Sequence, residues 1–436
     1  MRSRTHSDAD ADADEIPVTV LSGSLGAGKT TLLNRLLRNA GDRDLAVLVN
    51  DMGEVNVDAE LVAEGSDLEV EGGVAELSNG CICCELQDDL ETAVVRLARE
   101  RSFDHLIVES SGISEPAPVA RLFTTASRVA ARYEIDALVT VLDTRLFLDY
   151  FAGEGVPERS DAAAAANEGD GEGNRPLSDL LVDQVEVSNL VLCNKADLCT
   201  EAELEEAEEL VRAFRPGVET IRTEFSEVDP DRILGVDLFD PDRMGDLAGW
   251  QRALAEAEGS DHDHHDDEHD DHGHDHHDGH GHDHRHPDEV YGVTSFVYRA
   301  RRPFHPKRFA SFLETLPEGV VRSKGTAWVA CRDAKIGIGQ AGPSVRATVR
   351  GPWIAALPEI DRELYLSNRP GLEDEWDDEH GDRRTELVFI GTDVDEERLR
   401  ADLDDCLVAE EEWADAEDLE NPFPSDAEEE FVIREP

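Results

Sequence analysis

Positive charge is scarce in this sequence of 436 residues. Lys and Arg number 41 against 100 Asp and Glu, so the formal net charge at pH 7 is 41 − 100 = −59. Phosphate backbones and anionic lipids repel such a chain, which excludes proteins that bind nucleic acid or membrane by electrostatic attraction. Only five lysines occur, and the acid excess runs through the whole sequence. This pattern favours a halophile-like protein from a high-salt cytoplasm, where salt screens self-repulsion, over an ordinary acidic bacterial protein.

Long apolar runs and cysteines are also few. No run reaches the ~18 apolar residues of a membrane span, and the polar N-terminus lacks the apolar stretch of a signal peptide. Seven cysteines, an odd number, do not favour a disulfide framework. We therefore expect a cytoplasmic protein with reduced thiols, some of which bind metal.

Four segments lack apolar periodicity and are expected not to pack. They are a disordered acidic N-terminus (1–15), a low-complexity insert rich in Ala, Gly and Glu (157–176), an Asp/His-rich linker (258–288) and an acidic tail (408–436). The segments between them, 16–257 and 289–407, predict two globular domains.

The segment 16–257 alternates short apolar runs with helical patterns. Helices are expected to begin near Lys29, to include Leu86, Leu90, Val94 and Leu97 on one face, and to span Glu201–Phe214. The predicted strands are Val18–Leu21, Leu45–Val49, Leu106–Val108, Ala137–Leu142 and Leu190–Leu192. This alternation predicts an α/β fold with a mostly parallel sheet.

The segment 289–407 predicts a smaller α+β domain. An alternating strand pattern begins at Val293, and a helix is expected through Phe309 to Leu316. Further strands are predicted at Trp328–Ala330, Val345–Val349 and Leu387–Ile390.

A phosphate-binding P-loop pattern, Gly-Ser-Leu-Gly-Ala-Gly-Lys-Thr, lies between the first strand and the first helix. Its glycines let backbone N–H groups converge on phosphate oxygens, Lys29 supplies a positive charge, and the Thr30 hydroxyl is suited to Mg²⁺. The predicted nucleotide contacts here are Gly23, Ser24, Gly26, Ala27, Gly28, Lys29, Thr30 and Thr31.

Asn194-Lys195-Ala196-Asp197 follows the strand Leu190–Leu192. In a P-loop fold such a loop can recognise guanine, because the Asp197 carboxylate accepts from the ring N–H and the exocyclic amine while Lys195 packs along the ring. Open α/β sheets bind ligands at the carboxyl ends of their strands, which favours this interpretation over a simple polar turn. Asn194, Lys195 and Asp197 are therefore predicted base contacts, and the predicted ligand is GTP.

Glu109-Ser110-Ser111-Gly112 follows another predicted strand. Glu109 is suited to hold Mg²⁺ through water, and Gly112 lets a backbone N–H approach the γ-phosphate. A strand-capping Glu followed by a turn is the structural alternative. With this motif, Lys29, Thr30, Glu109 and Gly112 become the predicted catalytic residues.

Three thiols occur within four residues at Cys81-Ile82-Cys83-Cys84. Thiolates suit a soft or borderline cation such as Zn²⁺, with a fourth position left to a distant side chain or water. A redox dithiol or a buried turn is the alternative. We expect Cys81, Cys83 and Cys84 to bind a transition metal.

Together these motifs resemble the CobW family of P-loop GTPases. The resemblance is carried by Ser78–Cys84 with the P-loop, Glu-Ser-Ser-Gly and Asn-Lys-Ala-Asp motifs, and it extends to Arg322–Trp328 and Val388–Gly391. It implies a GTP-dependent metallochaperone or metalloenzyme activator with a CobW C-terminal domain. It also implies that the Cys motif is linked to nucleotide state through a switch segment, here Asn50–Asp58. Asp51 stands where many members have Glu, and Ser111 where they usually have Thr.

The linker run 261–286 holds twelve of the sixteen histidines, interleaved with Asp. Neutral imidazoles bind Zn²⁺, Ni²⁺ and Co²⁺, so this run predicts weak, exchangeable sites. The representative ligands are His262, His264, His265, His274, His276 and His277.

Three functions fit these motifs. The leading one is a GTPase that delivers a metal, foremost Zn²⁺, to a client metalloprotein. A second is a cobalt- or nickel-directed accessory GTPase for cobalamin synthesis or metalloenzyme maturation. The third is a metal-storage or sensing protein whose nucleotide site is regulatory.

Overall fold

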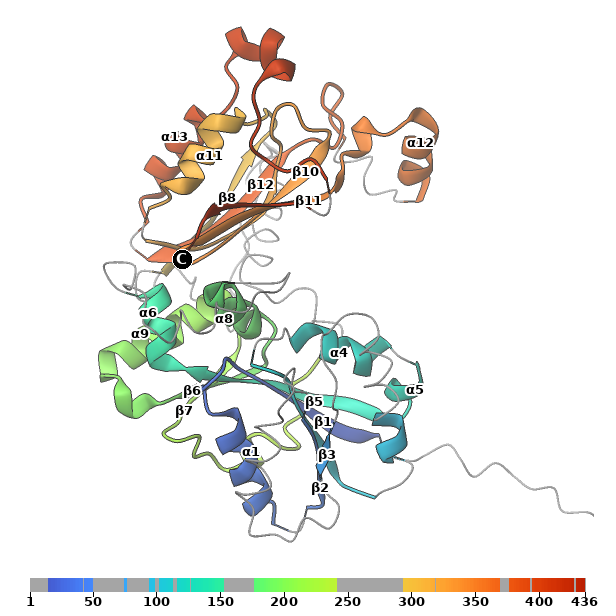
Figure 1. The fold of residues 1–436 in the computed structure, drawn as a ribbon, viewed down its shortest axis with the longest axis vertical. Helices are drawn as coiled ribbons and strands as arrows, with labels where there is room; N and C mark the ends of the chain where they lie inside the picture. The colour runs from blue at the N-terminus through green and yellow to red at the C-terminus, as the bar shows by residue number, and fades with distance from the viewer. Residues whose placement is uncertain are drawn as a thin grey trace, which may run out of the picture. The chain divides into compact units, whose positions relative to one another are not determined.

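The computed structural model describes residues 15–41, 43–49, 74–76, 94–98, 102–112, 116–125, 127–152, 176–240, 293–317, 319–368, 376–392, 394–426 and 429–435. These residues include no helix that is both long and apolar enough to cross a membrane. The chain forms two compact units (Figure 1). The first comprises Met1–Leu148, Leu180–Val211 and Gly217–Gly245, and the second comprises Asp149–Asp179, Arg212–Pro216 and Asp246–Pro436.

The unit boundaries differ from the predicted domains of 16–257 and 289–407. The first unit ends at Gly245, and the second unit includes the described residues 149–152, 176–179 and 212–216, which were expected in the first domain. Local apolar patterns predict where helices and strands lie along the sequence. They do not show to which unit the end of a helix or strand belongs.

The sheet of the first unit is parallel throughout, in the order β3-β2-β4-β1-β5-β6-β7. Its strands are β1 (Ile16–Ser22), β2 (Leu45–Val49), β3 (Val74–Glu76), β4 (His105–Glu109), β5 (Tyr133–Asp143), β6 (Leu190–Asn194) and β7 (Glu219–Arg222). Parallel strands are covered on both faces and are therefore mostly apolar, as in β4 and β6, where every residue is buried and only the terminal residues His105, Glu109 and Asn194 are polar. The five predicted strands and the parallel arrangement are confirmed.

Helices cover both faces of this sheet. Leu32, Leu33 and Leu36 of α1 (Lys29–Arg38) pack on one face, and Val119 and Phe123 of α4 (Pro116–Thr125) pack on the other. The other helical segments in this part of the chain are α5 (Ser127–Ala130), α6 (Thr144–Phe151), α8 (Leu177–Glu186), η1 (Ala196–Leu198), α9 (Glu201–Phe214) and η2 (Pro230–Arg232). The predicted helix 201–214 is thus confirmed. For the helix predicted from Leu86 to Leu97, the structure describes residues 94–98, and these are helical.

A buried polar cluster joins β1, β4 and β5. His105 Nε2 lies 2.8 Å from Thr19 Oγ1 and 3.8 Å from Asp136 Oδ2. The Asp136 carboxylate also accepts the backbone N–H groups of Gly235 (2.8 Å) and Asp237 (2.6 Å). Burial lowers the pKa of His105, and this effect outweighs the attraction of Asp136 for the imidazolium.

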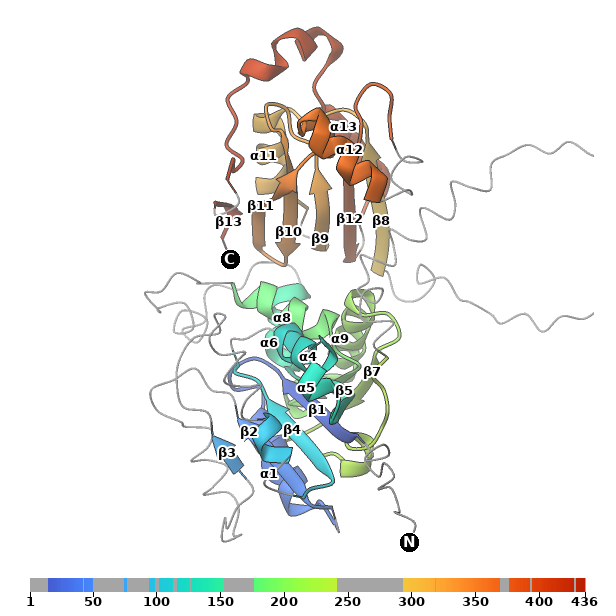
Figure 2. The ribbon, with the colours of Figure 1, turned by 90° about the vertical axis from the view of Figure 1, so that its right-hand side faces the viewer.

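The second unit contains an antiparallel sheet in the order β13-β11-β10-β9-β12-β8 (Figure 2). Its strands are β8 (Val293–Ala300), β9 (Val320–Ala327), β10 (Ala334–Ala341), β11 (Ser344–Pro352), β12 (Thr385–Thr392) and β13 (Glu430–Arg434). Its helices are α11 (Pro306–Glu314), η5 (Ile354–Ala356), α12 (Glu359–Asn368), α13 (Glu396–Asp405) and η7 (Glu410–Asp418). The predicted α+β character is confirmed.

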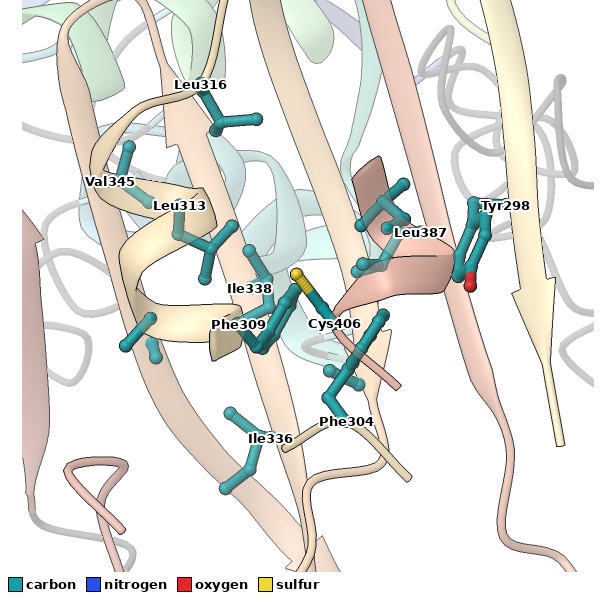
Figure 3. Packing of buried hydrophobic residues seen from close by; sticks show 14 of the residues in the cluster. Tyr298, Phe304, Phe309, Leu313, Leu316, Ile336, Ile338, Val345, Leu387 and Cys406 are labelled. Carbon is teal, nitrogen blue, oxygen red and sulfur yellow. The ribbon is translucent and has the colours of Figure 1, made fainter. Parts of the chain in front are cut away.

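The core of the second unit lies between the sheet and the pair α11 and α13. Phe309 of α11 points to the sheet and stacks on Phe304, with 4.0 Å between ring centroids, beside Ile338 and Cys406 (Figure 3). Stacked aromatic side chains bury a large apolar area and fix the spacing between helix and sheet.

The acidic tail prediction is wrong for residues 410–426 and 429–435. β13 pairs with β11, and Phe423 is only 1% exposed against Phe309. Acidic residues dominate this segment, but a few well-spaced aromatic side chains anchor it in the core while the carboxylates stay at the surface.

One other strand prediction is wrong, and two strands, β9 and β10, were not predicted. β9 ends at Ala327, so Trp328–Ala330 follows the strand instead of forming one. β10 was not predicted, because Gly337 and Gly339 remove the side chains on one face of the strand and with them the alternating pattern.

Phe423→Ala should lower the free energy of unfolding of the second unit by about 3 kcal/mol, because it empties a ring-sized volume in the core. The four tryptophans that the structure describes lie in this unit, so tryptophan fluorescence in a denaturant titration follows its unfolding. Val432→Ala, at a position 38% exposed on β13, is the control and should change little. Equal midpoints for the two variants would contradict the packing of this segment.

Acid should destabilise the first unit through His105. The unfolded chain takes up a proton below about pH 6.5 while the buried imidazole does not, so the free energy of unfolding falls by up to ~1.4 kcal/mol per pH unit below that value. In His105→Gln this loss disappears. Denaturant titrations followed by circular dichroism at pH 7.5 and 5.5, at one high salt concentration, should show a smaller pH effect in the variant. If the wild type and His105→Gln lose the same free energy of unfolding between pH 7.5 and 5.5, His105 is not the source of the acid sensitivity.

Candidate nucleotide-binding site

The predicted site residues come together at one edge of the parallel sheet. The loops after β1, β4, β5 and β6 all leave the carboxyl ends of neighbouring strands, and α1 follows the first of them directly (Figure 1). This edge is where open α/β sheets bind their ligands.

Glycine is required at two positions of the P-loop. Gly23 has φ 142°, and a Cβ there would lie 2.3 Å from the Val141 carbonyl oxygen. Gly28 has φ 113°, and a Cβ there would lie 2.5 Å from Asn194 Nδ2. The loop is thus held close to β5 and β6, and Gly26, which has φ 73° and no atom near its Cβ position, leaves its outer side open.

Lys29 lies inside the loop that it follows. The side chain is 6% exposed, and Nζ donates to the carbonyl oxygens of Gly23 (2.8 Å) and Ser24 (3.2 Å). The Ser24 hydroxyl is buried and has no hydrogen-bond partner among the residues that the structure describes. A buried hydroxyl and an ammonium group at the centre of a glycine loop fit the oxygens of a phosphate chain.

Oxygen ligands suited to Mg²⁺ lie beside this loop. Thr30 Oγ1 donates to Glu109 Oε1 at 3.5 Å, and Glu109, at the end of β4, is 1% exposed. Hydroxyl and carboxylate oxygens are the hard donors that Mg²⁺ prefers, so these two residues fit the ion. Thr31, the next residue on α1, is exposed.

The loop after β4 touches the P-loop at Gly112. A Cβ at this position would lie 2.8 Å from Leu25 Cδ2 and 2.9 Å from the Leu25 backbone nitrogen. The structure thus brings Gly112 next to the phosphate loop.

Asn194 joins three loops. Its Oδ1 accepts from Thr223 Oγ1 (3.0 Å) and Ser226 N (2.8 Å), and its Nδ2 donates to Ala27 O (2.7 Å) and Ser226 Oγ (3.0 Å). These four hydrogen bonds use the full capacity of the carboxamide. Asn194 therefore fixes the loops, whereas Asp197, on the exposed segment η1, is accessible to a base.

Lys195 has a left-handed backbone, with φ 59°. Its Nζ lies 2.5 Å from Asp143 Oδ2, at the end of β5. The neighbouring Thr144 donates its hydroxyl to the Asn194 carbonyl oxygen at 2.7 Å.

The sequence analysis missed Asp143, Thr144, Thr223 and Ser226. The only signal available was their position, because Asp143 and Thr144 stand at the end of the apolar strand β5, and Thr223 and Ser226 come soon after β7. Ser226 also has a positive φ of 56°, which its hydrogen bonds to Asn194 and to Gly28 O stabilise.

The predicted transition-metal ligands lie outside the described residues. They are Cys81, Cys83, Cys84 and the histidines of 261–286, and the switch segment Asn50–Asp58 is likewise not described. Within the described ranges, no group of three or more His, Cys, Asp and Glu side chains could hold a metal ion. Cys193, Cys199, Cys331 and Cys406 form no disulfide among these residues.

A P-loop between β1 and α1 of a parallel sheet, linked through Asn194 to an Asn-Lys-x-Asp loop, defines a P-loop GTPase. Residues 17–222 match the family described as CobW/HypB/UreG, nucleotide-binding domain, and residues 293–407 match the cobalamin synthesis protein cobW C-terminal domain. The chain belongs to the CobW family of GTPases.

Relatives of the chain carry related names. A zinc-regulated GTPase metalloprotein activator 1 from Dictyostelium discoideum is 35% identical over 445 residues, covering 96% of this chain and 85% of that protein. A zinc chaperone CobW from Sinorhizobium sp is 31% identical, covering 57% of this chain and 70% of that protein. The solved structure of Zn(II)-bound YjiA GTPase from E. coli is 19% identical, with a TM-score of 0.34, and covers 90% of this chain and 99% of that chain.

Lys29→Ala should reduce GTP turnover at least about a hundredfold, the scale of losing one charge contact in the transition state. The fold should persist, because the substitution removes no core volume. Phosphate release under saturating GTP measures the loss, with Lys307→Ala, an exposed lysine of the second unit, as the control. Turnover within a few-fold of the wild type would exclude the P-loop role of Lys29.

Proposed function

We propose that the chain is a metallochaperone that binds a transition metal, foremost Zn²⁺, at Cys81, Cys83 and Cys84 and uses GTP hydrolysis to deliver it to a client metalloprotein. The observation that carries the proposal is the position of β3 in the sheet. β3 runs parallel to β1, and its carboxyl end at Glu76 precedes the first thiol by five residues.

Parallel strands end at the same edge of a sheet. β3 is three strands from β1, a distance of about 14 Å at ~4.8 Å per strand. The thiols therefore follow a strand whose end lies at the nucleotide edge, which supports a link between metal binding and nucleotide state.

The nucleotide chemistry follows from the site. Lys29 and the P-loop amides would hold the β- and γ-phosphates, and Thr30 and Glu109 would hold Mg²⁺, which neutralises charge on the phosphates when bound. The Gly112 backbone, in contact with the P-loop, would follow the γ-phosphate. Asp197 and Lys195 would recognise the guanine base.

Zinc is the favoured metal because relatives are named zinc-regulated activator and zinc chaperone. Thiolates also suit Zn²⁺, whereas the carboxylates that dominate this chain suit harder ions. The histidines of 261–286 would add weaker sites that exchange metal with the surroundings. A cobalt- or nickel-directed activator would use the same thiols with a different metal.

Metal affinity should depend on the nucleotide. A nucleotide can move metal only through different affinities of the two states, and such coupling amounts to about 1–3 kcal/mol, or roughly 5- to 150-fold. Calorimetric titration of Zn²⁺ in high salt, with GDP and with a non-hydrolysable GTP analogue, measures the difference. By linkage, Zn²⁺ should change the affinity for GTP by the same factor.

Three variants separate the sites in this titration. Cys83→Ser should abolish the tight site and leave GTP binding intact, and deletion of 261–286 should remove only weak sites. Cys199→Ser, which changes a cysteine outside the Cys81–Cys84 motif that forms no disulfide, is the control. If the Zn²⁺ affinities in the two nucleotide states are equal, the chain is a metal-storage protein and not a GTP-driven chaperone.

A further inference from the structure

We infer that Asp143 is a positioning residue for the guanine nucleotide, acting through Lys195. The inference deepens the proposed function and depends on its assignment of Lys195 and Asp197 as base contacts.

The end of β5 lies directly beside the base loop. β5 and β6 are parallel neighbours, and Asp143 is in register with Asn194, the residue before Lys195. This register brings the Asp143 carboxylate to Lys195, with 2.5 Å between Oδ2 and Nζ.

The backbone around Lys195 is fixed from both sides. Thr144 Oγ1 donates to the carbonyl oxygen of Asn194 at 2.7 Å, and Ala196 N donates to the carbonyl oxygen of Thr223 at 3.1 Å. These contacts hold Lys195 in its left-handed conformation, which non-glycine residues rarely adopt.

The backbone contacts leave the long Lys195 side chain free to rotate. The ion pair with Asp143 fixes its far end, so that the aliphatic stem lies along one path between the loop and β5. A lysine already held in this way loses less conformational freedom when a base packs against its stem.

The ion pair between Asp143 and Lys195 is more buried than an ion pair at the surface of the chain. The Asp143 side chain is 12% exposed and that of Lys195 is 33% exposed, whereas the pair Lys307–Glu420 has 58% and 81% exposure. Salt screens a buried pair less than an exposed one. The contact between Asp143 and Lys195 is therefore less sensitive to ionic strength than the exposed pair.

Asp143 has a second contact that a test must preserve. Its Oδ1 accepts the backbone N–H of Leu146 at 3.2 Å and so caps the first turn of α6. Asp143→Asn keeps a carbonyl oxygen for this cap and removes the charge that holds Lys195.

A double-mutant cycle tests the inference. Binding of a fluorescent GDP analogue, and KM and kcat for GTP, are measured for wild type, Asp143→Asn, Lys195→Ala and the double variant. Asp143→Asn should weaken GDP about tenfold, within the range of coupling between contacting residues, and should raise KM while kcat stays constant. In the Lys195→Ala background, Asp143→Asn should have no further effect.

Two more variants keep the result interpretable. Lys195→Met keeps the aliphatic stem and the α6 cap but loses the charge, so it should match Asp143→Asn even if the latter folds poorly. Glu201→Gln removes an ion pair of the same length, with Arg222, elsewhere in the first unit and should leave GDP affinity unchanged.

The outcomes distinguish a failure of the role of Asp143 from a failure of the base loop. Losses that multiply in the double variant, or a drop in kcat without a change in KM, would overturn the role of Asp143 while the base loop stands. If Lys195→Ala and Asp197→Asn leave both GDP affinity and discrimination against ATP unchanged, the base loop itself fails, and the positioning role fails with it.

Discussion

The Asn194 carboxamide is the contact on which the nucleotide edge depends. Its two donors and two acceptors bind Ala27 of the P-loop and Thr223 and Ser226 after β7. The phosphate loop and the base loop therefore cannot move independently. Removal of this one side chain would leave several buried polar groups unpaired at once, which costs more than the hydrogen bonds themselves contribute.

Sequence predicted five of the seven strands that the structure describes in the first unit, because the signals for those strands are local. Leu106–Val108 of β4 and Leu190–Cys193 of β6 are continuous apolar runs, and the P-loop needs its glycines within one stretch of six residues. The partners of Asn194 could not be found in this way, because Thr223 and Ser226 lie 29 and 32 residues further along the chain. Their pairing depends on the order of β6 and β7 in the sheet, which no local pattern contains.

The second unit illustrates the opposite limit of sequence interpretation. β12 and β11 have the apolar pattern of strands and were predicted, whereas β10 contains two glycines and β13 lies in an acidic segment. The high average charge of the segment around β13 gives no indication of the few apolar side chains that determine its packing, foremost Phe423 against Phe309. Composition describes the surface of such a segment better than its contacts.

The pairing of β13 with β11 has a consequence for synthesis of the chain. β11 ends at Pro352 and its partner begins at Glu430, so the ribosome must make the whole intervening stretch before the two can meet. At about 5–20 residues per second this takes several seconds, during which the edge of β11 presents unpaired backbone groups to other nascent chains.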